Sequence, residues 1–473
     1  MYKFSPMVFG VIASIFASCA TPDRINAPNI VFLFADDQRS GTLNLGGKGN
    51  SEIMTPNLDA LAARGALFNN AYVFGADQTS VCYPSRAQLL SGKNLFRYKT
   101  LDLPSQNIDD FNLPVALRLA GYHTMRSGKA NNVPYGINME FNVNVEHGNR
   151  GSVKGNLAYF QDAIDFLDQK PLTGLADVTF AWDGKSPFFI YLAVGTPHAP
   201  YPAQDKHLAM YDWQEITAPE DALIKHPVLS TLIRKTVTKK SSIDQVKKEL
   251  KEYYASITFM DEQFGKLVAV LKDKGLYKNT IFVFAGDNGL SIGSHALEGK
   301  ANLMQYGGMH VPLILAGPGI KQQQSDALVY LTDIFPTLTE FADAPNPKSL
   351  DGKSLINVLS GKSEKVRDAL LTAYTRGAEQ RAVRDQRWKL FYFPDKKIYE
   401  LYDLQNDPRE LHNLSKDSEY AAELKRMKDL LAQEQQRYRD PYPEKARIKR
   451  VYNKKSLADP DIDDLLEKLS KRL

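Results

Sequence analysis

The sequence predicts an α/β protein: a large mixed, mainly parallel sheet sandwiched by helices, with a smaller C-terminal unit of antiparallel sheet plus helix. Two observations predict this fold. Apolar runs that end in polar side chains alternate with helical patterns along most of the 473 residues. After about residue 362 the pattern changes to alternating apolar and polar residues. A chain of this length is longer than a single compact core usually holds, so we expect two structural units.

Four short apolar runs predict buried strands of the parallel sheet, at residues 27–38, 186–200, 278–289 and 311–319. The first ends in Asp36 and Asp37, and the third ends in Asp287 and Asn288. Ligands bind at the carboxyl ends of strands in such sheets, so these ends are the predicted site.

Helical patterns lie between the strands, at residues 56–65, 113–122 and 243–274. The C-terminal unit begins with an alternating segment at 382–414 and continues in a helix at 418–437. We therefore expect a main domain over 27–362 and an α+β unit with a basic tail over 363–473. The net charge of +4 is small for this length and excludes the strong basic excess of nucleic-acid-binding proteins.

The first 18 residues predict an export signal, because Lys3 precedes an apolar run that is too short to span a membrane. The following "FASC" resembles the lipobox of bacterial lipoproteins. This resemblance implies lipidation of Cys19, a tether over 19–26, and a lipid anchor in the periplasm or at the outer membrane or cell surface. A plain secretory signal is the alternative. With Cys19 lipidated, Cys82 has no disulfide partner, since the chain holds only two cysteines.

Two pairs of hard oxygen ligands predict a metal site. Divalent cations such as Ca²⁺ take about six to eight oxygen ligands. The set Asp36, Asp37, Asp287 and Asn288 contains no thiolate or imidazole, which disfavours zinc. We expect one Ca²⁺, with Mg²⁺ also possible. The alternative is that both pairs are ordinary turn residues.

The segment "CYPSRAQLLSG" at 82–92 resembles the signature of type I, formylglycine-dependent sulfatases of the alkaline phosphatase superfamily. Further blocks match in the correct order: "PNIVFLFADD", "GYHTMRSGK", "TPHAP", "GDNG" and "GSHALEGK". The resemblance covers about residues 27–415 and implies an alkaline-phosphatase-like fold.

The resemblance also implies a mechanism. A maturase oxidises Cys82 to formylglycine (3-oxoalanine), and one oxygen of the hydrated aldehyde attacks the sulfur of a sulfate ester. Loss of a proton from the second hydroxyl releases sulfate and restores the aldehyde. Arg86 lies four residues after Cys82, on the same face if this segment is helical, and can support the diol.

Other implied contacts follow from matching blocks. Lys129 and Lys300 contact the sulfate or the leaving group, and His198 donates a proton or binds sulfate. His295 contacts substrate. Many sulfatases have Trp-His after the Gly-Lys pair, whereas this chain has Ala130 and Asn131. Asn131 can hydrogen-bond but cannot act as a base, and it is expected to contact substrate. His310 is expected to be structural or to lie behind the site.

The sequence therefore predicts a sulfatase that acts on a sulfated carbohydrate, such as a glycosaminoglycan or another polysaccharide. Two alternatives stay open: a phosphonate or phosphate diester hydrolase of the same superfamily, and a non-catalytic glycan-binding protein of this fold.

Overall fold

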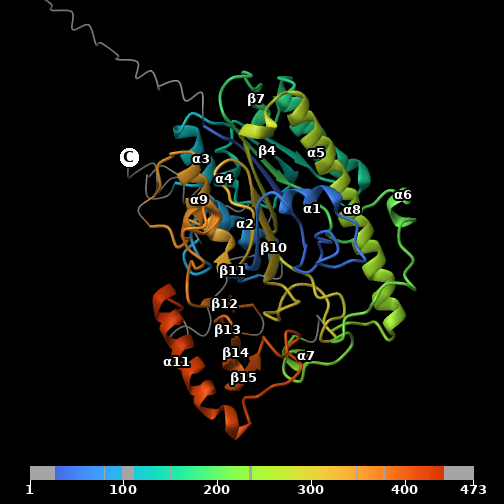
Figure 1. Ribbon diagram of the computed structural model, residues 1–473, viewed down its shortest axis with the longest axis vertical. Helices are drawn as coiled ribbons and strands as arrows, with labels where there is room; N and C mark the ends of the chain where they lie inside the picture. Colours follow the sequence, from blue (N-terminus) through green and yellow to red (C-terminus); the bar gives the residue numbers. More distant parts are fainter. Residues whose placement is uncertain are drawn as a thin grey trace, which may run out of the picture.

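The computed structural model confirms the predicted fold class (Figure 1). It describes residues 27–78, 80–98, 111–149, 151–233, 237–347, 349–376 and 379–441. The expected signal, Cys19 and the tether lie outside these residues. The large sheet contains, in spatial order, β11 (Gln323–Tyr330), β2 (Ala66–Tyr72), β10 (His310–Ala316), β9 (Thr280–Gly286), β1 (Asn29–Ala35), β8 (Phe188–Ala193), β4 (His123–Lys129) and β5 (Val143–His147).

The large sheet is parallel except at β10, which runs antiparallel to both β9 and β2. β1 lies near the centre and pairs in parallel with β8 and β9. Its side chains alternate between two cores: Phe32 and Phe34 face one, while Val31 and Leu33 face the other. Burial on both faces explains why the strand is apolar throughout.

Helices cover both faces of this sheet (Figure 1). One face carries α1 (Pro56–Ala62), α5 (Val153–Leu167) and α8 (Ile243–Asp273), and the other carries α2 (Cys82–Ser91), α3 (Leu113–Leu119) and α9 (Ile334–Phe341). Local capping fixes where several of these helices begin. Ser242 Oγ accepts from the Gln245 N–H at the start of α8, and Asn112 Oδ1 accepts from the Val115 N–H at the start of α3. The predicted helices at 56–65, 113–122 and 243–274 are thus confirmed, with slightly shorter bounds.

The C-terminal unit is a second sheet covered by the helix α11 (Ala421–Tyr438). In spatial order the sheet contains β15 (Ile398–Asp403), β14 (Trp388–Phe393), β13 (Gln380–Arg384), β12 (Leu370–Tyr374) and β3 (Gly75–Ala76). β12 to β15 pair antiparallel, as expected, whereas β3 comes from the main domain and pairs in parallel with β12. The chain just before Cys82 is therefore anchored to the C-terminal sheet.

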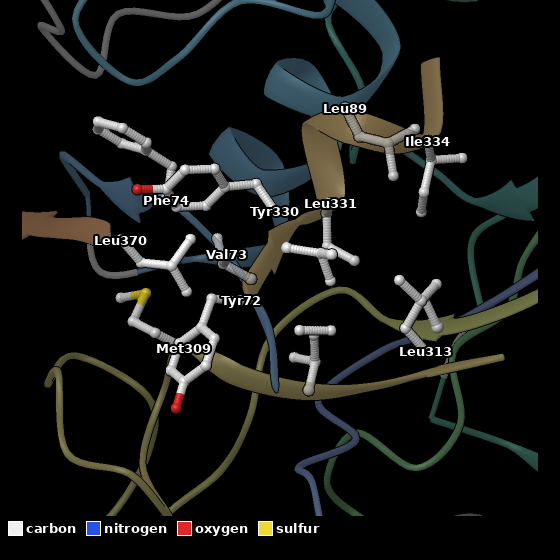
Figure 2. Packing of buried hydrophobic residues seen from close by; sticks show 14 of the residues in the cluster. Tyr72, Val73, Phe74, Leu89, Met309, Leu313, Tyr330, Leu331, Ile334 and Leu370 are labelled. Carbon is white, nitrogen blue, oxygen red and sulfur yellow. The ribbon is translucent and has the colours of Figure 1, made fainter. Parts of the chain in front are cut away.

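One apolar core continues across the two units (Figure 2). Tyr330 and Leu331 of the large-sheet region pack with Leu370 of β12, and Leu89 brings α2 into the same cluster. α2 ends at Gly92, whose φ of 66° is left-handed and whose Cβ position would lie 2.3 Å from Leu350 Cδ2. This packing holds the helix that begins at Cys82.

Short elements connect these layers: α4 (Tyr135–Asn138), β6 (Leu172–Thr173), η2 (Leu175–Asp177), β7 (Thr179–Phe180), α6 (Asp205–Leu208), α7 (Leu229–Leu232), η4 (Tyr277–Asn279), η5 (Leu331–Asp333), α10 (Ile356–Leu359), η6 (Pro394–Lys396) and η7 (Ser418–Tyr420). Within the described ranges, no helix has the length and apolar character needed to cross a membrane. The expected domain boundary at residue 362 falls between α10 and β12.

Candidate active site

The structure brings the four predicted metal ligands together at the carboxyl ends of β1 and β9. These strands are in register, with Ala35 opposite Gly286. The Asp37 N–H donates to Asp287 Oδ1 (3.0 Å), and Asn288 Nδ2 donates to Asp37 Oδ1 (2.8 Å). Asp37 has a φ of 71°, a left-handed conformation that Asp adopts more readily than most residues. This turn directs its carboxylate to the strand ends.

The free oxygens of this cluster fit a divalent cation. Asp36 Oδ1 and Asn288 Oδ1 are buried, and neither has a hydrogen-bond partner within the described chain. An unsatisfied buried oxygen is costly, and a hard cation would satisfy both atoms. Asp36, Asp37 and Cys82 each place a ligand atom within 4.8 Å of the others. The Asp36, Asp37, Asp287 and Asn288 side chains would hold the cation.

Cys82 is the first residue of α2 and is fully buried beside this cluster. Its Sγ lies 3.3 Å from Ser80 Oγ and 3.2 Å from Lys300 Nζ. Burial and, next, the Asp36 carboxylate raise the pKa of the Cys82 thiol to about 11. Working cysteine nucleophiles have lowered pKa values. The environment is thus unsuited to a thiolate.

Three cations surround the carboxylates. Arg86 Nε donates to Asp287 Oδ2 (2.8 Å), Lys129 Nζ donates to Asp36 Oδ2 (2.6 Å), and Lys300 Nζ donates to Asp37 Oδ1. Burial alone would raise the pKa of Asp36, but Lys129, Arg86 and two further cations hold it well below its usual range. For Asp287, burial outweighs Arg86 and raises the pKa to about 7. Preorganised positive charge is therefore concentrated at the Cys82 end of α2.

His198 lies at the edge of the cluster, after β8. Its Nδ1 is 2.7 Å from the Ala199 carbonyl oxygen, which only accepts, so Nδ1 carries a proton. Nε2 lies 3.6 Å from Asp37 Oδ2 and belongs to a partly exposed ring. This orientation leaves Nε2 directed toward the site, as a group that binds sulfate or transfers a proton requires.

A cavity of about 460 Å³ opens beside Cys82 and is called the nucleophile cavity after the role predicted for that residue. It is lined by Gln78, Ser80, Tyr83, Lys129, Ala130, Asn131, Asn132 and Gly148. Lys129 reaches from this cavity to Asp36, so it connects the open space to the carboxylates. Asn131 lines the cavity and is exposed, consistent in position with the predicted substrate contact.

Two predicted histidines lie elsewhere. His295 is buried, with Nε2 2.8 Å from the Arg409 carbonyl oxygen, and it is not among the described residues that line the nucleophile cavity. The substrate contact expected of His295 stays a prediction, and the position of its ring away from this cavity does not support it. His310 is stacked on Tyr72 and bonded to the Asn69 carbonyl, and burial lowers its pKa to about 3. Its geometry agrees with the expected structural position.

Sequence reasoning missed a residue that contacts Arg86. The chain turns at Asn131, whose φ is 55°, and this turn places the next residue, Asn132, against the guanidinium. With its amide oxygen facing Arg86, Asn132 accepts from Nη1 at 2.6 Å. The sequence offers only a second asparagine after Lys129, and nothing local says which one turns inward.

A buried ion pair behind Lys129 was also missed. Arg126 Nη1 donates to Glu146 Oε1 (3.1 Å), and Arg126 Nη2 donates to the Lys129 carbonyl (2.8 Å). Glu146 Oε2 accepts from the Asn131 N–H (3.3 Å). The pair therefore holds the backbone on both sides of Ala130. The apolar and charged pattern of the segment contains no signal for this pairing between β4 and β5.

Comparison with known families gives a direct match. Residues 28–344 match the family model described as Sulfatase, and residues 293–437 match the one described as N-sulphoglucosamine sulphohydrolase, C-terminal. The chain is 26% identical to an arylsulfatase of Clostridium perfringens, over 90% of this chain and 98% of the relative. It is 25% identical to an N-acetylglucosamine-6-O-sulfatase of Bacteroides thetaiotaomicron, over 93% of this chain and 92% of the relative.

Solved structures agree on the fold. One is a protein in complex with its substrate D-glucosamine-2-N,6-O-disulfate, with a TM-score of 0.73, 23% identity, and coverage of 89% of this chain and 99% of that one. Another is a phosphonate monoester hydrolase of Agrobacterium radiobacter, with a TM-score of 0.68, 22% identity, and coverage of 87% and 96%. Sulfatases generally use a metal and a formylglycine, and the acidic cluster is a possible metal site. The family match extends over most of the chain, which belongs to the sulfatase family and is a sulfuric ester hydrolase.

Proposed function

We propose that this sulfatase removes sulfate from a sulfated carbohydrate, with a formylglycine formed from Cys82 and one Ca²⁺ held by Asp36, Asp37, Asp287 and Asn288. The observation that carries the proposal is the position of Lys300. Its Nζ contacts both the Cys82 Sγ and the Asp37 carboxylate. One cation thus joins the nucleophile position to the metal-ligand cluster.

The modified residue and the metal supply chemistry that the chain lacks. Hydrated formylglycine supplies an oxygen nucleophile and a way to release sulfate, and a bound cation stabilises negative charge on oxygen. Mg²⁺ is the alternative metal, because it takes the same oxygen ligands.

The chain's own cations bind and orient the anionic ester. Lys129 and Lys300 neutralise the sulfate oxygens, and buried cations do so more strongly than solvated ones. Arg86 Nη2 is buried without a partner among the described residues, so it is a donor available to the nucleophile or the sulfate. His198 offers Nε2 to the leaving oxygen.

Support for a carbohydrate substrate comes from the relatives. One curated relative is an N-acetylglucosamine-6-O-sulfatase, and one solved structure holds a sulfated glucosamine. A further relative, from Formosa agariphila, is an ulvan-active sulfatase that is 27% identical over 86% of this chain and 79% of its own length. The cavity beside Lys129 is polar, as a sugar site requires.

We also propose that the protein is exported as a bacterial lipoprotein lipidated at Cys19 and anchored in the periplasm or at the outer membrane or cell surface, and that a maturase oxidises Cys82. The apolar N-terminal run and "FASC" support export, and the Cys-x-Pro-x-Arg core at 82–86 supports the maturase. Replacing Cys19 with alanine should move the protein from the membrane fraction to the soluble exported fraction. An unchanged distribution would contradict lipidation.

Kinetics separate the proposal from its alternatives. The enzyme, co-expressed with a formylglycine-generating maturase, is assayed on an aryl sulfate, an aryl phosphate diester and a panel of sulfated saccharides that includes glucosamine 6-sulfate. We expect kcat/KM for the aryl sulfate to exceed that for the diester, and we expect release of sulfate from at least one of the saccharides. A strong diester preference would favour the phosphonate or phosphate diester hydrolase. Activity on aryl sulfate without release from any sulfated saccharide would contradict the carbohydrate substrate.

A further inference from the structure

A second cavity, of about 380 Å³, begins two residues after Asp37 and shares no lining residue with the nucleophile cavity. Segments distant in sequence build its walls: 39–41, part of the loop at 50–52, 217–220, Tyr254 of α8, Tyr306, and Arg409 of the C-terminal unit. Its volume lies within the range of small-molecule sites, about 300–1,000 Å³. The sulfatase chemistry described above leaves this cavity unused.

Arg39 is the unusual group in this cavity. It is 5% exposed, and its Nη1 donates to the Leu290 and Ser291 carbonyls (3.5 and 3.1 Å). Arg39 forms no ion pair with any described residue, and its Nε and Nη2 atoms donate no hydrogen bond to any described residue. A buried cation without an anionic partner is costly. The open Nε–Nη2 edge has the geometry that binds a carboxylate with two parallel hydrogen bonds.

The other walls match a sugar rather than a bare anion. Arg409 Cζ lies 4.1 Å from the centre of the Tyr306 ring, and Tyr254 Oη accepts from Asn50 Nδ2 (3.0 Å). Aromatic rings with polar tips suit the mixed apolar and hydroxyl surface of a pyranose. Both Glu52 oxygens accept from the Thr217 N–H (3.0 and 3.1 Å), and Glu220 is exposed at the rim.

The two glutamates decide between ligand classes. Their ionised carboxylates only accept hydrogen bonds, so they need a donor, which sugar hydroxyls supply and a sulfate ion lacks. A ligand that satisfies Arg39 and also the glutamates carries one carboxylate and several hydroxyls. Uronic acids have this combination.

We propose that this cavity binds a uronic acid residue, with the sugar carboxylate on the Nε–Nη2 edge of Arg39, hydroxyls on Glu52 and Glu220, and the ring against Tyr306. The site is separate from the nucleophile cavity, and its occupation does not require sulfatase activity. It would hold an acidic polysaccharide at a second point on the enzyme.

The test is equilibrium binding of sodium glucuronate and of glucose to the full chain, measured by ligand-observed NMR. We expect glucuronate to bind at least about tenfold more tightly than glucose, because glucose lacks the carboxylate. Arg39→Gln should abolish this preference. Thr217→Trp, which fills the cavity from an exposed wall position, should abolish glucuronate binding without touching the Arg39 bonds. Ile224→Trp, at a 48% exposed position outside the cavity, is the matched control and should bind normally.

A further variant, Ala130→Trp, blocks the nucleophile cavity instead and should leave glucuronate binding unchanged. Equal affinity for the two sugars, normal binding by Thr217→Trp, or loss of binding in Ala130→Trp would each overturn the proposal. Thermal unfolding of every variant tests whether its fold is intact. None of these outcomes depends on sulfate-ester hydrolysis, so they are independent of the proposed function.

Discussion

Lys129 offers the sharpest test of how the site handles negative charge. Its Nζ lies 2.6 Å from Asp36 Oδ2, and the residue is only 4% exposed although it lines the nucleophile cavity. Replacement by methionine keeps the approximate length of the side chain and removes the charge. An exposed ion pair contributes only about 0–1 kcal/mol. A preorganised donor that stabilises transition-state charge contributes about 2.7–4 kcal/mol, or about 10²–10³ in kcat.

We therefore expect Lys129→Met to lower kcat/KM for an aryl sulfate by about 10²–10³. The assay compares kcat/KM and the melting temperature with those of the wild type and of Lys170→Met. Lys170 is an exposed lysine that pairs with Asp165 and Asp168, so its loss should leave activity unchanged. A loss of less than about fivefold in a folded Lys129→Met protein, equivalent to about 1 kcal/mol, would refute this reasoning.

Three further outcomes are expected. Burial lowers the pKa of His310 from 6.5 to about 3. The stability that the neutral His310 contributes is therefore present above pH 6.5 and is lost as the pH falls toward 3. The free energy of unfolding should fall by up to about 1.4 kcal/mol per pH unit over this range. The free energy of unfolding in urea, measured between pH 7 and pH 4, should therefore depend less steeply on pH in His310→Gln than in the wild type. Parallel pH dependences in the two proteins would contradict the lowered pKa of His310. Chelation with EDTA should lower both activity and melting temperature, because removal of the metal leaves Asp36 Oδ1 and Asn288 Oδ1 unsatisfied. Added Ca²⁺ should restore both. Unchanged activity and melting temperature in EDTA would exclude the metal site. Leu192→Ala, fully buried in β8, should cost about 2–5 kcal/mol in urea unfolding, against less than about 0.5 kcal/mol for the exposed Leu119→Ala; equal losses would contradict the assigned core.

The strand ends were predictable because local pattern and topology agree there. Apolar runs that stop at Asp36 and at Asp287 belong to strands that pair in parallel, so their carboxyl ends meet. From the sequence, a helix at Cys82 is only a condition for Arg86 to share its face. The structure meets that condition, since α2 begins at Cys82 and Arg86 one turn later reaches Asp287 of the same cluster.

Backbone turns and long-range pairings were not predictable. The choice of Asn132 over Asn131 depends on one left-handed residue, and asparagine adopts that conformation without a distinctive pattern. The position of His295 also depends on a left-handed backbone conformation, with a φ of 54°. Its ring contacts the carbonyl of Arg409 in the C-terminal unit, which is 114 residues away in sequence. Contacts of this kind depend on how the two units pack, which the local sequence does not specify.

The mass of the tryptic peptide that contains residue 82, measured after co-expression with a formylglycine-generating maturase, decides whether Cys82 becomes a formylglycine. We expect the mass of formylglycine at this position, together with aryl sulfatase activity that rises in proportion to the modified fraction. An unmodified cysteine in an enzyme that still hydrolyses sulfate esters would contradict this expectation.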